Sequence, residues 1–148
     1  MLSANNEVLV LLAHILLYIY LVSEVVKTDR FIIEFGMGID FHGQDVTKAA
    51  VKAAKDAISR SCLVGLNEVC GFSQDNIDEG VFIEVTIAVT RPEEVVAEDV
   101  AECFPVGSVK VKAVEGGLRT EGLYFPGFGD NDDSIEVAVA CVKVEVKK

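Results

Sequence analysis

The chain has 148 residues, of which 51% are hydrophobic and 25% charged, so it carries enough apolar material for the core of one ordinary domain. Acidic residues outnumber basic ones by 24 to 13, and the resulting net charge of −11 repels phosphate backbones, which argues against a nucleic-acid partner. The four cysteines form no C-x-x-C pair, so we expect reduced thiols and a cytoplasmic protein.

The N-terminal segment differs from the rest. Residues 8–22 are apolar except for His14, and the run continues to Val26, close to the length of a membrane span. Three interpretations remain open: a single-span anchor, a helix packed on the domain or on another subunit, and a mis-annotated start ahead of a true chain beginning near Val26 or Lys27. The third fits best, because the domain pattern begins abruptly at Phe31. A membrane is a partner only if residues 8–26 form a genuine span, which would leave the domain cytoplasmic.

The first half of the domain, taken as residues 27–148, predicts a strand, a helix and a second strand. Residues 31–35 are rich in β-formers and are followed by a glycine-rich motif that is expected to end the strand. Apolar residues recur at helical spacing from about Asp45 to Ser59. After an irregular stretch over 61–80, Val81–Val89 alternates as the clearest strand.

The second half predicts a helix and two strands. Thr90-Arg91-Pro92-Glu93 is typical of a capping box, opening a helix that runs to about Cys103. A strand over 109–114 is closed by two glycines, and residues 122–133 form a loop. In the last strand, over 135–146, the apolar parity switches, which indicates a β-bulge near Cys141 or a change of covering layer. The order β-α-β-α-β-β predicts an α+β fold: a mixed sheet with helices on one face.

The best candidate site is the motif over residues 36–43, G-M-G-I-D-F-H-G. Gly36 and Gly38 permit positive φ and close approach of a ligand. Asp40 and His42 are two residues apart, so in extended chain their side chains converge. That pair can bind a divalent metal with a third ligand from elsewhere, or Asp40 can orient His42 as a general base or acid. The metal is one option, and no other cofactor is indicated.

An anionic ligand group suits the same loop. The helix after Gly43 directs its positive end at the loop, and Lys48 lies near its first turn. Asp130, in the loop Gly127–Asp133, is a further candidate ligand-binding residue, as is Glu115, which with Arg119 flanks Gly116-Gly117. The plainer alternatives stay open: turn and cap residues around 36–43, a solvated acidic turn at 127–133, and an ordinary hairpin at 116–117.

The motif, the helix start behind it, and the segments 114–118 and 126–130 resemble a small family of conserved hypothetical proteins of the Listeria type, found in bacteria and plants and defined by G-x-G-x-D-x-H-G. The resemblance covers about Phe31 to the C-terminus and implies no particular activity. Gly36, Gly38, Asp40 and His42 also resemble a run in methylerythritol cyclodiphosphate synthase whose Asp and His bind metal. This chain lacks a matching third histidine.

Three functions are compatible with these observations. The first is a small enzyme that acts on an anionic or cyclic metabolite through His42 and Asp40. The second is a domain that binds a small-molecule ligand at the same loop without turnover. The third is a structural oligomer whose glycines serve packing alone. Small sheets with one uncovered face often complete their cores by self-association, so we expect a homo-oligomer.

Overall fold

The computed structural model describes residue 14 and residues 27–148. The alternatives for the N-terminal apolar run therefore lie outside the described residues, apart from the helical assignment of His14. Among the residues that are described, no helix is both long enough and apolar enough to cross a membrane.

The sheet is mixed, as the sequence predicted. Its main strands lie in the order β1 (Thr28–Asp40), β5 (Ser134–Lys147), β2 (Val81–Val89) and β3 (Ser108–Glu115). β5 is antiparallel to both of its neighbours, whereas β2 and β3 are parallel. A short strand, β4 (Leu118–Glu121), pairs with the first residues of β5 beyond the end of β2. β5 is thus the central strand.

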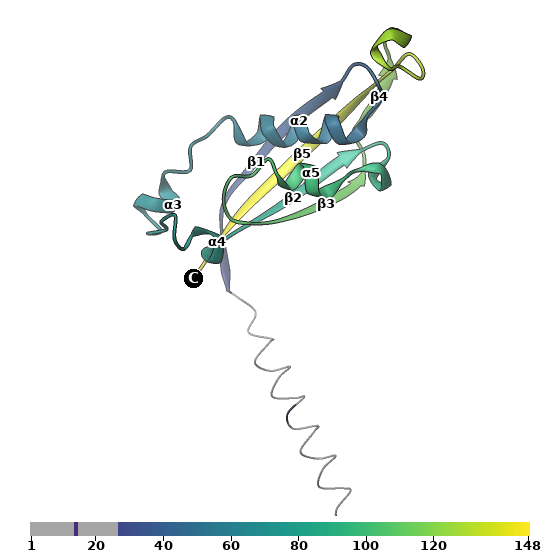
Figure 1. The fold of residues 1–148 in the computed structure, drawn as a ribbon. Coiled ribbons are helices and arrows are strands. Elements are labelled where there is room, and N and C mark those ends of the chain that lie inside the picture. The colour runs from purple at the N-terminus through teal and green to yellow at the C-terminus, as the bar shows by residue number, and fades with distance from the viewer. Residues whose placement is uncertain (1–13, 15–26) are drawn as a thin grey trace, which may run out of the picture.

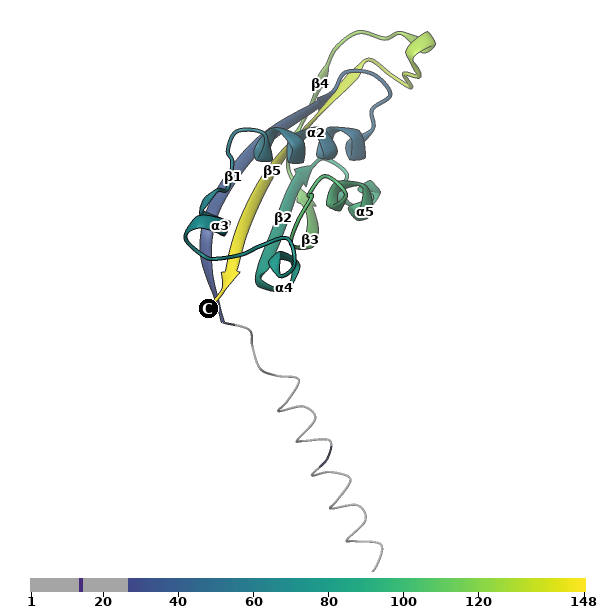
Figure 2. The same ribbon diagram turned by 60° about the vertical axis from the view of Figure 1, so that its left-hand side comes forward.

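The helices cover one face of this sheet, which confirms the predicted layering (Figures 1 and 2). The main helix, α2 (Val46–Ile58), lies across β1, β5 and β2, and the short α5 (Ala97–Ala101) lies over β3. Two single-turn helices, α3 (Gly65–Glu68) and α4 (Ile77–Gly80), occupy the connection between α2 and β2. The loop between β4 and β5 lies at the opposite end of the domain from α3 and α4 (Figure 1).

The contact between α2 and β1 is unusually close. The face of the helix turned to the sheet is built from fully buried alanines: Ala49, Ala50, Ala53, Ala54 and Ala57. Opposite them, Gly36 and Gly38 of β1 leave no room for a side chain. A Cβ on Gly36 would lie 2.3 Å from the Ala53 carbonyl oxygen, and one on Gly38 would lie 2.1 Å from that of Ala49. Glycine therefore lets the helix backbone rest directly on the strand.

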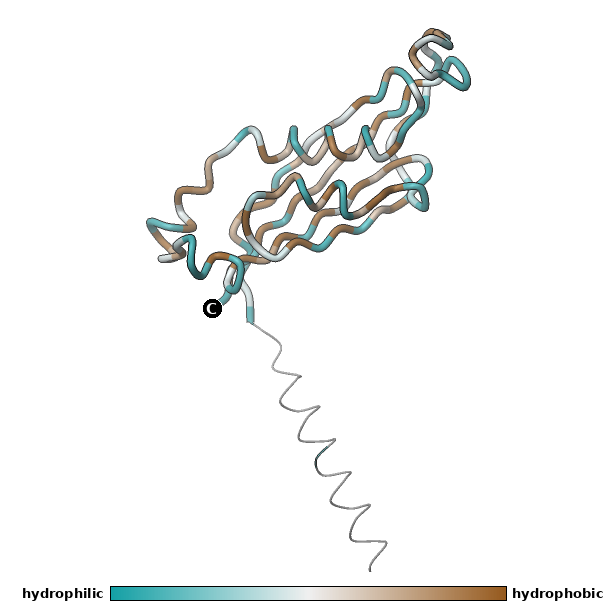
Figure 3. Tube along the Cα trace, viewed as in Figure 1, coloured by the Kyte–Doolittle hydropathy of each residue, from teal (hydrophilic) through white to brown (hydrophobic). Residues whose placement is uncertain are grey.

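Within residues 27–148, no helix lies over the other face of the sheet. β5 is buried at its even positions from Ser134 to Val144, and its odd positions, such as Val139, point away from α2. On β1 the outward residues Ile33, Phe35 and Met37 are 46%, 59% and 55% exposed. In Figure 3 hydrophobic residues continue along the central strands. Both faces of β5 thus carry apolar residues, and this explains why the apolar positions in its sequence change from odd to even numbers.

Several predicted elements need correction. β1 continues through the glycines to Asp40, so the motif does not end the strand at Phe35. The only register shift between β1 and β5 lies at Arg30/Ile32, so no bulge occurs near Cys141. The expected second helix is split into a 3₁₀ turn, η1 (Pro92–Glu94), and α5. The Thr90 hydroxyl donates to Glu136, so there is no capping box.

Candidate functional site

The chain turns sharply between β1 and α2. Gly43 has φ +93° and Gln44 has φ +52°, a left-handed conformation that is uncommon for a residue with a side chain. Asp45 caps α2, its carboxylate accepting a 3.0 Å hydrogen bond from the Lys48 amide. Because the strand ends at Asp40, His42 lies beyond it and the alternation that aligned the two side chains no longer applies.

His42 is held by Asp130, a residue from the loop before β5. Its Nδ1 lies 2.9 Å from Asp130 Oδ2, although the two residues are 88 positions apart. The Asp130 side chain is completely buried, whereas that of His42 is 35% exposed. Within the described chain, Nε2 of His42 makes no hydrogen bond. The pair therefore has a buried carboxylate behind the ring and a ring nitrogen left for a ligand.

Asp130 is anchored as an ionised carboxylate. Its oxygens accept hydrogen bonds from the Phe125 and Gly43 amides, each at 2.8 Å, as well as contacting His42. Burial alone would raise its pKa. The hydrogen bonds from Phe125, His42 and Gly43 outweigh that effect and lower the pKa of Asp130 to about 2. A carboxylate so stabilised accepts a hydrogen bond from the protonated Nδ1 of His42 and so favours the tautomer in which Nε2 carries the lone pair.

Aromatic rings flank His42 on the loop side. The centroids of Phe128 and Phe125 lie 5.0 and 6.0 Å from that of His42, and the two phenylalanine rings are 5.8 Å apart. They are 67% and 47% exposed. Further large apolar residues are exposed close by in sequence: Phe41, Leu123 and Tyr124. Phe125 and Phe128 thus form an apolar rim beside the imidazole at one end of the domain.

A buried polar network supports the turn. The Gln44 side chain donates a 3.0 Å hydrogen bond to the Ser134 carbonyl and accepts a 2.9 Å hydrogen bond from the Asn131 amide. The Arg91 guanidinium donates one hydrogen bond of 2.7 Å to the Gln44 carbonyl and another of 2.6 Å to the buried Glu136 carboxylate. Arg91 therefore links the turn to β5. Sequence analysis missed Gln44, Arg91 and Glu136 as parts of this site. Glu136 had a signal: it stands at an even position of β5, on the side that is buried farther along the strand.

Asp40 does not orient His42. Its carboxylate accepts from the Asp45 amide at 3.0 Å and lies 3.4 Å from Lys52 Nζ, so it braces the end of β1 against α2. Gly36 and Gly38 face α2 and neither has the positive φ that the sequence suggested, so the prediction of their backbone conformation was wrong. Gly43 does have positive φ, with Lys48 Nζ 3.8 Å from where its Cβ would lie.

The other predicted residues divide between the site and the surface. Asp130 joins His42, and Arg119 contacts Ser134, Asp132 and Glu136 behind it. Glu115 is exposed at the end of β3 and shares none of these contacts within the described chain. For the predicted divalent metal, no three His, Cys, Asp or Glu side chains converge anywhere in residues 27–148 as a ligand set. Asp40 and His42 face separate partners.

Comparisons with known proteins place the chain in a family. No curated protein matches it. A crystal structure described as an FtsZ-like protein of unknown function from Nostoc punctiforme PCC 73102 is 38% identical in sequence. It covers 83% of this chain and 99% of its own, with a TM-score of 0.73. The family model of the conserved hypothetical Lin0512 proteins matches residues 30–144, so the chain belongs to the Lin0512 family.

Proposed function

We propose that this protein catalyses a proton-transfer reaction on a small anionic metabolite that carries a ring, with His42 as the general base and acid. The observation that carries the proposal is the 2.9 Å contact of His42 Nδ1 with a fully buried Asp130 carboxylate. A histidine held in this way presents Nε2 to solvent as a proton acceptor. Once His42 is protonated, the Asp130 carboxylate stabilises the imidazolium, and Nε2 of the imidazolium can return the proton to the substrate.

The surroundings favour this class of substrate. Exposed phenylalanine faces beside His42 suit a planar or apolar ligand body. Lys48, 62% exposed in its side chain and 3.7 Å from Asp45, is a cation available for an anionic group. Lys52 is less available to a ligand, because its ammonium group donates a 2.6 Å hydrogen bond to the Ile39 carbonyl. The Gly43 amide is also committed, since it donates to Asp130.

The test follows turnover in substrate mixtures, so the substrate need not be identified first. The full chain is incubated in D₂O with mixtures of cyclic and aromatic carboxylates and phosphate esters, and proton NMR records deuterium incorporation or new signals. Removal of a general base costs about 10²–10⁴-fold in rate, so His42→Gln should abolish the change and Asp130→Asn should slow it. Lys48→Ala should raise KM for anionic substrates, with Lys55→Ala, exposed on the same helix, as the control.

One outcome would overturn the proposal, and a further observation would then point to the alternative. Identical spectra for wild type and His42→Gln in every mixture would remove His42 from any turnover. If, in addition, a mixture raised the melting temperature of wild type but not of His42→Gln, the loop would bind a ligand without transforming it. That result would favour the non-catalytic binding domain.

A further inference from the structure

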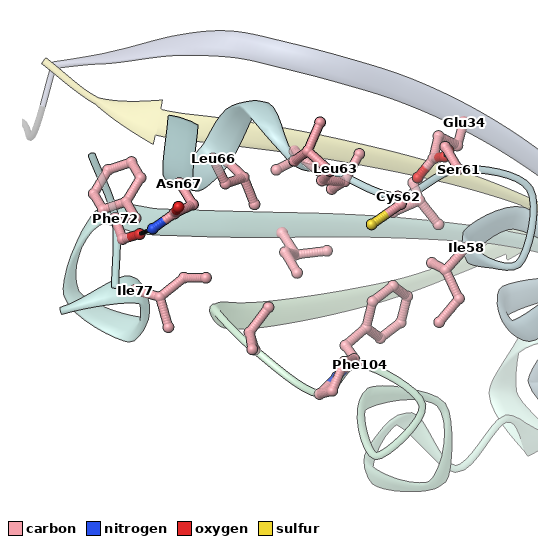
Figure 4. Close-up of a pocket in the computed structure, with 16 residues that line it drawn as sticks. Glu34, Ile58, Ser61, Cys62, Leu63, Leu66, Asn67, Phe72, Ile77 and Phe104 are labelled. Carbon is pink, nitrogen blue, oxygen red and sulfur yellow. Dashed lines mark hydrogen bonds between the residues drawn. The ribbon is translucent and has the colours of Figure 1, made fainter. Parts of the chain in front are cut away.

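A cavity lies at the other end of the domain from His42. It has a volume of about 380 Å³ and lies beneath the connection that carries α3 and α4. Figure 4 shows side chains from that connection, from the end of α2 and from the segment before β3 converging on it. Its walls are apolar, formed chiefly by Ile58, Leu63, Leu66, Phe72, Ile77 and Phe104. The volume is in the range of small-molecule sites.

The polar groups of the lining are few. The Asn67 side-chain amide donates a 2.8 Å hydrogen bond to the Phe72 carbonyl and so stabilises the wall of the cavity. The Ser61 hydroxyl donates to the Glu34 carboxylate. Among the described residues that line the cavity, Glu34 is the only Asp, Glu, Lys, Arg or His. A single carboxylate therefore faces an apolar chamber.

Glu34 has no cation partner within the described chain, where the ion pairs involve other carboxylates. Burial raises its pKa, as expected for a carboxylate that lacks a compensating charge. The net charge of −11 adds a field that attracts cations and repels anions. The chamber thus offers apolar contact to a ligand body and one negative group to its polar end.

We infer that this cavity binds a small organic amine, with its apolar body among Leu66, Phe72 and Phe104 and its ammonium group on the Glu34 carboxylate. The volume suits a ligand of roughly ten to fifteen non-hydrogen atoms. The inference is independent of the reaction proposed at His42, because the two sites share no residue and lie at opposite ends of the sheet. Whether or not an amine binds in this cavity, the result neither supports nor contradicts the reaction proposed at His42.

Three probes with the same body separate charge from apolar burial: 4-phenylbutylamine, 4-phenylbutan-1-ol and 4-phenylbutyrate. Isothermal calorimetry on the full chain should give the lowest Kd for the amine, a Kd about fivefold higher for the alcohol, and no binding of the carboxylate. Glu34→Gln keeps an acceptor for Ser61 and should raise the Kd of the amine to that of the alcohol, while leaving the alcohol unchanged.

A second variant tests the location. Val106 lines the cavity, so Val106→Phe should weaken the amine and the alcohol alike by filling the space. Val69→Phe, at an 83% exposed position outside the lining, is the matched control and should bind as wild type does. Circular dichroism verifies that each variant is folded. The inference is overturned if the amine does not bind, if the carboxylate binds as tightly as the amine, or if Glu34→Gln leaves the amine Kd unchanged.

Discussion

His42 and Asp130 could each be singled out from sequence, but their pairing could not. Both stand in short polar and glycine-rich segments, where such residues are rare enough to notice. Their contact depends on β1 and β5 being neighbours in the sheet, which brings positions 88 apart together. Asp40 was assigned to His42 because strand alternation was extended two residues past the point where the strand ends. The alternation applies within β1, and β1 does not reach His42.

The buried Asp130 carboxylate predicts an acid-dependent loss of stability. Its pKa in the folded protein is about 2, below the value of about 4 expected when unfolded. A group with a lowered folded pKa stabilises the fold above its unfolded pKa, and this contribution is lost as pH falls from about 4 to about 2. Asp130→Asn lacks it throughout. The difference in melting temperature between wild type and Asp130→Asn should therefore be large at pH 6 and shrink at pH 2.5.

Thermal unfolding followed by circular dichroism at pH 6, 4 and 2.5 measures that difference. Asp133→Asn removes a carboxylate from an exposed position in the same loop and serves as the control for a general charge effect. A gap between wild type and Asp130→Asn that stays constant across this pH range would contradict the assignment of Asp130 as the stabilising acid.

The elements with strong periodicity were predicted well. The main helix and Val81–Val89 matched the structure to within about a residue, because each has one buried face and a clear repeat. β4 was missed because all four of its residues are exposed, which leaves no burial pattern to read. β1 was cut short because glycines typical of a turn serve here to admit a helix. Glycine has two uses that a single sequence does not distinguish.

The close helix–strand contact predicts a strong effect of one methyl group. In Gly38→Ala the new Cβ would lie 2.1 Å from the Ala49 carbonyl oxygen and 2.3 Å from the Ala53 nitrogen, so α2 must shift away from β1. Overpacking of this kind costs about 1–3 kcal/mol of unfolding free energy. Urea denaturation followed by circular dichroism measures the loss. Gly127→Ala, where a Cβ meets nothing within 4 Å, is the control; an unchanged midpoint in Gly38→Ala would refute the packing role.

At the scale of the whole molecule, the homo-oligomer stays a prediction, and we expect its contact on the sheet face that no helix of residues 27–148 covers. Phe35, Met37 and Val139 are exposed on it, and Met37 and Val139 are direct cross-strand partners. Toward the other end of β5, Lys143 bridges Glu84 and Glu145, so the face also carries both charge signs. A second copy could bury the apolar part of this face.

Sedimentation velocity of the full chain tests this association. Wild type should sediment as an oligomer, and Phe35→Lys should dissociate it, because a lysine at the centre of the contact would lose its hydration. Val69→Lys changes an equally apolar residue that is 83% exposed elsewhere, in the segment after α3, and should leave the assembly intact. A wild-type chain that sediments as a monomer, or a Phe35→Lys variant that stays assembled, would show that this face is not the contact.

The central position of β5 has a consequence for synthesis of the chain. β1 is made first among the described strands and pairs only with β5, which is made last. While the ribosome is still adding residues 41–133, β1 has no strand to pair with, and Asp130 has not yet emerged to meet His42. β1 therefore pairs only once β5 has been made, and a nascent chain stopped before residue 134 leaves β1 without its partner strand, exposed to chaperone binding.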